Sequence, residues 1–165
     1  MSVISIATQK GGTAKTTTAL NLAAALQRKG YSVLLIDSDP QANLTYSLGV
    51  PDDCAINLYT EYKTEISGQA SNLKKAIIET TSGLKLIPSS FNLGNAEQEL
   101  VSKLARESTL RKRMLRPIVN EYDFIFIDCP PSFGMLTINA VAVNAFSLLF
   151  CSGNTAIKNS RAKLS

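Results

Sequence analysis

The sequence contains no histidine, and this absence excludes several kinds of catalytic and metal-binding site. Without an imidazole, the chain cannot form a His-ligated zinc site, use a histidine general base or build a Ser-His-Asp triad. Cysteine is scarce as well, because there are only three, which are Cys54, Cys129 and Cys151. They are far apart and odd in number, so we expect reduced thiols in a cytoplasmic protein rather than a disulfide framework or a metal site.

The chain also lacks segments typical of secreted or membrane-spanning proteins. No basic stretch precedes an apolar one at the start, which argues against a signal peptide. The longest apolar-rich stretch, residues 135–151, is interrupted by polar residues and predicts a helix and a strand rather than a membrane span. With 165 residues, 45% of them apolar, the composition predicts one soluble globular domain, and we expect no membrane partner.

Residues 10–17 carry the strongest functional signal, with the sequence Lys-Gly-Gly-Thr-Ala-Lys-Thr-Thr. They lie between an apolar run at residues 3–7 and a helical apolar pattern at residues 19–26, and the order of strand, glycine-bearing loop and helix is typical of a phosphate-binding site. Two adjacent glycines let several N–H groups point at one anion. Lys15 can reach the outer phosphates, and the Thr16 hydroxyl can ligate a phosphate-bound Mg²⁺. The candidate cofactor-binding residues are Lys10, Gly11, Gly12, Thr13, Ala14, Lys15, Thr16 and Thr17.

Carboxylates follow two of the predicted strands. The apolar run 33–36 predicts a buried parallel strand that is followed by Asp37 and Asp39. A carboxylate at such a strand end faces the crevice where open α/β sheets bind ligands, and it can orient a water against a γ-phosphate or hold Mg²⁺. The alternative for Asp37 is a helix cap. A second apolar run, residues 124–127, ends at Asp128 in the pattern of a Walker B carboxylate. The candidate metal ligands are Thr16, Asp37 and Asp128.

Three details of these motifs resemble the ParA family of partition ATPases. Lys10 precedes the glycine pair and Ala14 stands where the ordinary phosphate loop has glycine, which resembles the deviant phosphate loop of the ParA/MinD class. Asp-Pro-Gln-Ala-Asn at residues 39–43 is similar to the family's first switch segment. Asp-Cys-Pro-Pro-Ser at residues 128–132 is similar to its Walker B strand and second switch. The resemblance covers roughly residues 1–150.

The resemblance implies an ATPase that uses ATP and Mg²⁺. It implies that Lys10 crosses an ATP-dependent sandwich homodimer to touch the nucleotide of the second copy, that Lys15 binds phosphate, and that Asp39 activates the attacking water. These three are the candidate catalytic residues, and the alternative for Lys10 is an ordinary solvated loop lysine. In the family, the dimer binds DNA non-specifically and a centromere-bound, ParB-like partner stimulates hydrolysis. The expected role is plasmid or chromosome partitioning, in the cytoplasm at the nucleoid.

The whole chain predicts an α/β fold, a P-loop NTPase-type, mostly parallel, doubly wound sheet with helices on both faces. Strands are expected at residues 3–7, 33–36, 84–88, 124–127 and 148–151. Helices are expected at residues 15–29, near Thr45, near Leu58, and at residues 73–79, 96–106, from there to about 120, and 135–144. Gly30 is suited to end the first helix, whose apolar pattern predicts cover on all sides. Asn95 and Gln98 have the spacing of a capping box.

The C-terminal part of the sequence allows more than one interpretation of its structure and function. Six basic residues lie close together, and they are Lys103, Arg106, Arg111, Lys112, Arg113 and Arg116. This run predicts either a DNA-contacting face or, more commonly, a solvated helix face. We expect residues 1–151 to form the nucleotide-binding domain and residues 152–165 an atypical polar tail, so that the family's C-terminal third is lacking and ATP hydrolysis by this length of chain stays open. The alternatives are a non-catalytic relative that binds nucleotide or a partner, and a MinD-like positioning ATPase, although the tail has too few large apolar residues for a membrane-binding helix.

Overall fold

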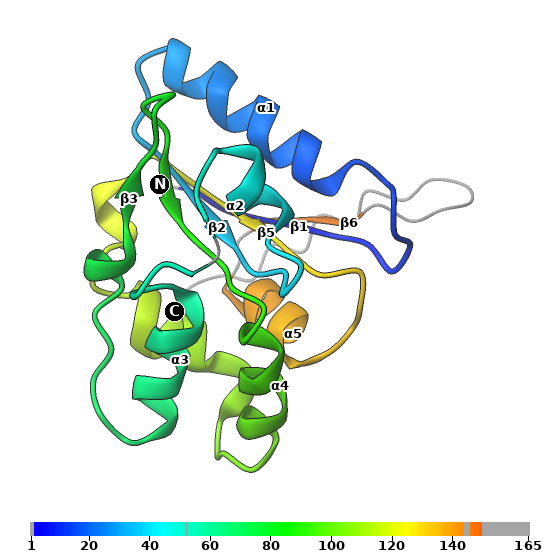
Figure 1. The fold of residues 1–165 in the computed structure, drawn as a ribbon, viewed down its shortest axis with the longest axis vertical. Helices are drawn as coiled ribbons and strands as arrows, with labels where there is room; N and C mark the ends of the chain where they lie inside the picture. Colours follow the sequence, from blue (N-terminus) through cyan, green and yellow to red (C-terminus); the bar gives the residue numbers. More distant parts are fainter. Residues whose placement is uncertain (1, 52, 144–145, 150–165) are drawn as a thin grey trace.

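The computed structural model describes residues 2–51, 53–143 and 146–149, which form a six-stranded sheet with helices on both faces (Figure 1). The strands lie in the order β3-β4-β2-β5-β1-β6. They span Ser2–Ala7 (β1), Val33–Asp37 (β2), Ile78–Glu79 (β3), Lys85–Ile87 (β4), Phe124–Asp128 (β5) and Phe146–Leu149 (β6). All neighbours pair in parallel except β3, which is antiparallel to β4. The predicted α/β class and the mostly parallel, doubly wound sheet are confirmed.

The helices of the described residues form two layers around this sheet. The α-helices span Lys15–Arg28 (α1), Asn43–Ser47 (α2), Leu58–Ile66 (α3), Leu93–Val101 (α4) and Met135–Ala142 (α5). Short 3₁₀ helices span Leu73–Ala76 (η1), Arg106–Ser108 (η2) and Val119–Glu121 (η4), and a π-helix spans Leu110–Leu115 (η3). α1 and α2 cover one face of the sheet, whereas α3, α4 and α5 cover the other (Figure 1).

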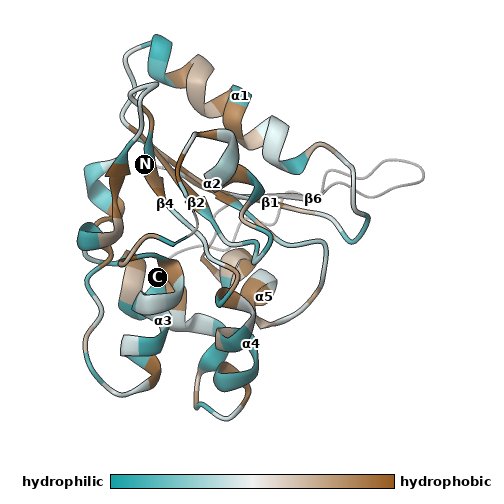
Figure 2. Cartoon of the chain, in the orientation of Figure 1, coloured by the Kyte–Doolittle hydropathy of each residue, from teal (hydrophilic) through white to brown (hydrophobic). Residues whose placement is uncertain are grey.

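Alternating side chains of the central strands build the two cores. In β2, Leu34 and Ile36 pack in the core under α3 and α4, and Leu35 packs in the core under α1. In β5, Ile125 and Phe126 divide between the two cores in the same way. None of these five side chains is more than 1% exposed, and Figure 2 shows apolar residues along the strands between the helical layers. Strands buried on both faces explain why these segments are continuous apolar runs in the sequence.

The first helix ends where the sequence predicts, within one residue. Gly30 adopts φ +87°, and its N–H donates to the carbonyl of Gln27 at 2.9 Å. The N–H of the next residue donates to the carbonyl of Leu26 at 3.2 Å, which completes a Schellman motif. The expectation that residues 19–26 are covered on all sides is wrong. Leu22 is 39% exposed, because only one face of α1 packs on the sheet.

The structure corrects the helix predicted at residues 73–79. Only residues 73–76 are helical, and residues 78–79 form the edge strand β3, which pairs with β4 through a hairpin. The hairpin turn holds Gly83 at φ +79°, and its N–H donates to the carbonyl of Thr80 at 2.8 Å. The β-branched residues after Ala76 favour extended backbone, and here this preference outweighs the apolar spacing of a helix.

The segment between β4 and β5 also differs from the prediction. α4 begins at Leu93, which is fully buried, and no capping box forms at Asn95 and Gln98, which lie inside the helix. The predicted second helix is divided into η2, η3 and η4. Ala105 at φ +55° breaks the helical path before η2, and Pro117 lacks the N–H that a continuous helix needs.

The last described strand lies at the edge of the sheet beside β1. β6 begins at Phe146, two residues before the predicted start at 148, and α5 ends at Ala142 rather than at 144. The predicted tail, residues 152–165, lies outside the described residues. Within the described part of the chain, no helix combines the length and the apolar character that a membrane span requires.

Candidate functional site

The carboxyl ends of β1, β5 and β2 meet at one edge of the sheet, and the candidate residues gather there (Figure 1). The pairing register places Asp37 of β2 directly opposite Asp128 of β5. The loops that leave the three strands, residues 8–14, 38–42 and 129–134, lead into α1, α2 and α5. Open parallel sheets bind ligands at this kind of edge. Three loops that are far apart in the sequence therefore share one site.

The loop between β1 and α1 is curled by two positive φ angles. Gly12 has φ +73°, and Ala14 has φ +59° with ψ 28°. Ala14 stands where the ordinary phosphate loop has glycine, and the left-handed conformation costs an alanine about 1–2 kcal/mol. Contacts inside the loop brace it, since the Thr13 hydroxyl donates to the Lys10 carbonyl at 3.1 Å and the Lys10 N–H donates to the Thr8 hydroxyl at 3.3 Å. This curled backbone is the shape in which N–H groups converge on an anion.

Lys15 and Thr16 begin α1 beside the end of β5. Lys15 is only 8% exposed, and its charge acts on Asp128. The Thr16 hydroxyl donates to Oδ2 of Asp128 at 2.6 Å. The other carboxylate oxygen, Oδ1, is buried and has no hydrogen-bond partner in the described part of the chain. A hydroxyl and a carboxylate with an unsatisfied buried oxygen are hard oxygen donors, so these residues fit Mg²⁺.

Opposing effects act on the carboxyl group of Asp128. Burial is the largest effect, and together with the charge of Asp39 it raises the pKa of Asp128 to about 6. The hydrogen bond from Thr16 and the charge of Lys15 act in the opposite direction. A buried carboxylate of this kind is stabilised by a neighbouring positive charge. The electrostatics of the site therefore favour a cation beside Asp128.

Asp37 is fully buried and is hydrogen-bonded through both carboxylate oxygens. Oδ2 accepts from the N–H and the hydroxyl of Thr45 at 2.8 and 2.7 Å, and Oδ1 accepts from the N–H of Asp39 at 3.1 Å. Burial, the largest effect, raises the pKa of Asp37 to about 7 in spite of these bonds. The contacts with Thr45 fix α2 to the end of β2. This geometry favours the capping alternative for Asp37 over direct contact with a metal.

Asp39 lies at the entrance of the loop after β2 and is 7% exposed. Its Oδ1 accepts from the Gln41 N–H at 2.9 Å, and its carbonyl accepts from the Ser89 hydroxyl at 2.7 Å. The Ser89 N–H also donates to the Thr45 hydroxyl at 3.0 Å. Ser89 therefore ties the end of β4 to the loop after β2, a role that the sequence analysis missed. The signal was a pair of serines, residues 89–90, which follow Pro88 after a strand that neighbours β2.

The loop that follows Asp128 is held at its far end by Glu97 of α4. Oε1 of Glu97 accepts from the Leu136 N–H at 3.4 Å, in the first turn of α5. Gly134, just before α5, lies so close that an added Cβ would stand 1.6 Å from this oxygen. The carboxylate thus caps α5 from another helix, and glycine leaves the room for it. Sequence analysis missed Glu97 because a cap from another helix has no local spacing pattern.

The remaining candidates face solvent or lie elsewhere. Lys10 and Thr17 are exposed on the loop and the first turn of α1. The basic run, residues 103–116, does not reach this edge of the sheet. It follows η2 and η3 on the face covered by α3, α4 and α5 (Figure 1).

The parallel sheet and the loop after β1 define a protein of the P-loop NTPase class. The profile of a family described as an AAA domain matches residues 1–152. The chain belongs to this family and is a ParA-type protein.

Relatives and solved structures agree with this assignment. The chain is 41% identical over 146 residues to the sporulation initiation inhibitor protein Soj of Bacillus subtilis strain 168, and the match covers 86% of this chain and 54% of Soj. It is 43% identical over 141 residues to the chromosome partitioning protein ParA of Myxococcus xanthus strain DK1622, and this match covers 85% of the chain and 48% of that protein. It is also similar to cobyrinic acid a,c-diamide synthase from Mycobacterium smegmatis, solved with an ATP analogue and magnesium, with a TM-score of 0.82 and 35% sequence identity over 90% of this chain and 59% of the synthase chain. The chain spans about half the length of these curated relatives.

Proposed function

We propose that the chain binds Mg-ATP at the carboxyl ends of β1, β5 and β2 and hydrolyses it. The observation that carries this proposal is the contact between the Thr16 hydroxyl and Oδ2 of Asp128 at 2.6 Å, with Oδ1 of Asp128 buried and unpartnered among the described residues. Thr16 and Asp128 would hold Mg²⁺, which in nucleotide sites takes one or two protein ligands, the rest being phosphate oxygens and water. The metal would neutralise charge on the phosphates during transfer.

The loop between β1 and α1 is proposed to hold the phosphates. Its N–H groups and the N-terminus of α1 attract an anion. The space beside Gly11 and Gly12 is open, since an added Cβ at either position would meet no atom within 4 Å. Lys15 would contact the outer phosphates, and its buried position beside Asp128 means that little side-chain entropy is lost on binding.

Asp39 is proposed to position the water that attacks the γ-phosphate. Its charge raises the pKa of Asp128, so the two carboxylates lie within electrostatic reach across the site. Asp37, bonded to Thr45 and to the Asp39 N–H, is proposed as a positioning residue that orients Asp39. Lys10, exposed at the start of the loop, is proposed to reach the nucleotide of a second copy in an ATP-dependent homodimer.

We further propose a role in plasmid or chromosome partitioning, in the cytoplasm at the nucleoid. The similar protein of Myxococcus xanthus, which carries the name chromosome partitioning protein, supports this role. We propose that, in this role, the ATP-bound dimer binds DNA non-specifically and a ParB-like partner stimulates hydrolysis. Because the chain spans about half of its relatives, these activities are proposed for the whole protein.

An ATP-binding titration in Mg²⁺ and in EDTA tests the proposal. Thr16→Val removes only the hydroxyl, so it should weaken binding in Mg²⁺ more than binding in EDTA. Thr81→Val, at an exposed position of the β3–β4 hairpin, is a matched control and should change neither. Equal losses in both buffers would refute the metal assignment. A chain that binds no ATP in either buffer would refute the proposed function.

A further inference from the structure

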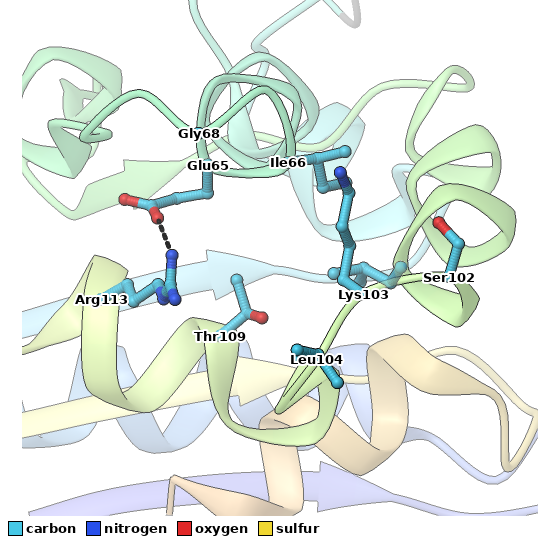
Figure 3. Close-up of a pocket in the computed structure, with 9 residues that line it drawn as sticks. Glu65, Ile66, Gly68, Ser102, Lys103, Leu104, Thr109 and Arg113 are labelled. Carbon is cyan, nitrogen blue, oxygen red and sulfur yellow. Dashed lines mark ion pairs between the residues drawn. The ribbon is translucent and has the colours of Figure 1, made fainter.

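A cavity of about 350 Å³ lies between the ends of α3 and α4 and the start of η3 (Figure 3). The lining residues include Ile66 of α3, Leu100 of α4, Lys103 just after α4, Thr109 just before η3 and Arg113 of η3. None of them belongs to the proposed nucleotide site. The volume lies within the range of roughly 300–1,000 Å³ that is typical of binding pockets in proteins.

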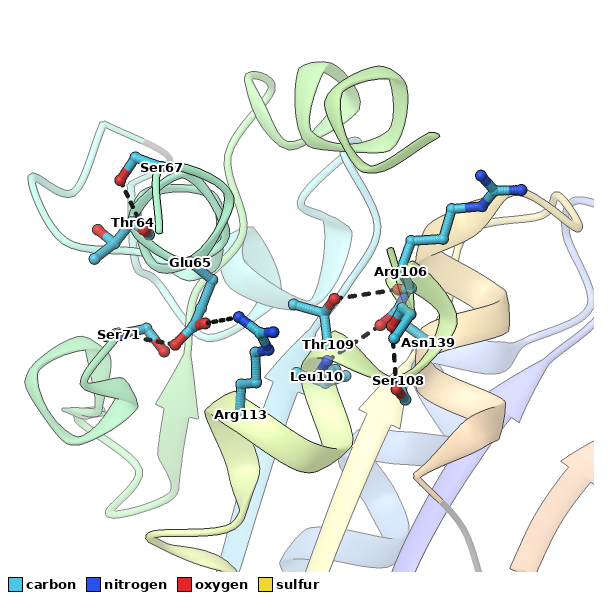
Figure 4. Close-up of polar contacts among 11 residues, drawn as sticks. Thr64, Glu65, Ser67, Ser71, Arg106, Ser108, Thr109, Leu110, Arg113 and Asn139 are labelled. Atoms are coloured by element: carbon cyan, nitrogen blue, oxygen red, sulfur yellow. Dashed lines mark hydrogen bonds and ion pairs between the residues drawn. The ribbon is translucent and has the colours of Figure 1, made fainter. Parts of the chain in front are cut away.

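Buried and partly buried polar contacts connect the walls of this cavity (Figure 4). The side chain of Glu65 is 7% exposed, accepts a backbone N–H at 2.8 Å and pairs with Arg113 at 3.7 Å. Asn139 of α5 is fully buried, accepts from the Leu110 N–H at 3.1 Å and donates to the Arg106 carbonyl at 2.8 Å. These contacts hold η2 and η3 in place against α3 and α5. A ligand would therefore meet a pre-formed cavity, which lowers the entropic cost of binding.

The rim of the cavity exposes an apolar side chain, because Leu104, one of the lining residues, is 96% exposed. Inside, Leu100 is buried and Ile66 is half-buried. Aliphatic side chains thus continue from the cavity to its rim. A single exposed leucine is ordinary, but one beside a fixed cavity can pack against a side chain that enters it.

The charge around the cavity is positive. Glu65 and Arg113 compensate each other, whereas no ion pair involving Lys103 is found within the described residues. Figure 3 shows the Lys103 ammonium group at the edge of the cavity, beside Ile66. Of the six basic residues at positions 103–116, Lys103 and Arg113 line the cavity, and Glu65 is the one acidic residue among its lining residues. An occupant of complementary charge would carry carboxylates next to its apolar group.

We infer that this cavity docks an acidic peptide segment of a partner protein. An aliphatic or aromatic side chain of the segment enters between Ile66, Leu100 and Leu104, and a neighbouring carboxylate pairs with Lys103. The inference goes beyond the proposed function and does not depend on nucleotide binding. Duplex DNA fits this surface less well, because phosphates need no aliphatic cavity. Single-stranded DNA fits it less well too, because residues 101–116 contain no aromatic side chain on which a base can stack.

An NMR titration of the ¹⁵N-labelled full chain tests the inference. The probe is a short peptide of alternating glutamate and leucine, compared with the same peptide carrying serine for leucine and with a DNA duplex. The glutamate–leucine peptide should give saturable shifts at residues 66–68, 100–104 and 109–113, and the serine peptide should bind more weakly. No shifts at these residues, equal binding of the two peptides, or shifts caused by the duplex instead would overturn the inference.

Substitutions at the rim distinguish docking in the cavity from non-specific binding of the peptide. Lys103→Glu and Leu104→Ser, both at exposed positions, should each weaken peptide binding by roughly fivefold or more. Lys75→Glu and Leu22→Ser change the same residue types at exposed positions of η1 and α1 and should leave binding unchanged. All four variants should retain the melting behaviour of the unmodified chain. Losses as large in the control variants would overturn the assignment to this cavity.

Discussion

Replacing Gly134 by alanine tests whether Glu97 holds the loop that follows Asp128. An added Cβ at position 134 would stand 1.6 Å from Oε1 and 2.5 Å from Cδ of Glu97, so the carboxylate has to move away. Gly134 itself has φ −74° and ψ −175°, which alanine adopts without strain. The cost of the substitution therefore arises from Glu97 and not from the backbone.

The magnitude follows from two opposing effects. Displacing Glu97 removes the cap on the Leu136 N–H, and a lost helix cap costs about 0.5–2 kcal/mol. Exchange of glycine for alanine at compatible backbone angles stabilises by about 0.4–1 kcal/mol through the unfolded state. The two ranges combine to between a loss of about 1.6 and a gain of about 0.5 kcal/mol, and from their midpoints we expect Gly134→Ala to lower the free energy of unfolding by about 0.5 kcal/mol. In a Glu97→Ala background the cap is already absent, so Gly134→Ala should raise the free energy of unfolding by about 0.4–1 kcal/mol.

The unmodified chain, the two single variants and the double variant form a double-mutant cycle, and urea unfolding measures the free energy of unfolding of each. The prediction is a change of sign in the effect of Gly134→Ala when Glu97 is removed. Glu99→Ala, on the same helix, is the matched control and should leave the effect of Gly134→Ala unchanged. If Gly134→Ala has the same effect with and without Glu97, the carboxylate does not cap α5 and the reasoning is refuted.

Three further predictions concern the nucleotide site. Ala14→Gly relieves left-handed strain and should raise the free energy of unfolding by up to about 1 kcal/mol, whereas the control Ala25→Gly, inside α1, should lower it by about 1 kcal/mol. If urea unfolding shows that both substitutions destabilise the chain, Ala14 is not strained. Asp39→Ala should reduce ATP turnover by about 10²–10⁴ while ATP binding survives, and turnover within a few-fold of the unmodified chain would assign the water to another group. Lys10→Ala should retain ATP binding but lose dimerisation in sedimentation with a non-hydrolysable analogue, and an unchanged dimer fraction would leave Lys10 a solvated lysine.

The sheet was predictable because its central strands are buried on both faces and appear as apolar runs. The weaker elements were not predictable in the same way. β3 is a two-residue edge strand whose extended backbone depends on pairing with β4, and this pairing leaves little trace in the local sequence. Ala105 has φ +55°, and an alanine gives no local warning that the helical path ends there.

Sequence spacing identified the parts of the candidate site that lie on strand ends. The glycine-bearing loop and Asp128 follow apolar runs, and parallel pairing brings such ends together. Thr45, Ser89 and Glu97 were missed because their partners come from other parts of the chain. Asp37 shows the limit most clearly, because only the contacts to Thr45 favour a capping role over direct contact with a metal.

Lys15 gives the most direct test of the central claim, that the loop between β1 and α1 binds the phosphates of ATP. Lys15→Ala removes a charge-assisted contact of about 1.5–3 kcal/mol. We expect the dissociation constant for a fluorescent ATP analogue in Mg²⁺ to rise roughly 10- to 100-fold. Lys29→Ala, exposed at the other end of α1, should leave it unchanged. A Lys15→Ala chain that binds the analogue as tightly as the unmodified chain would contradict the claim.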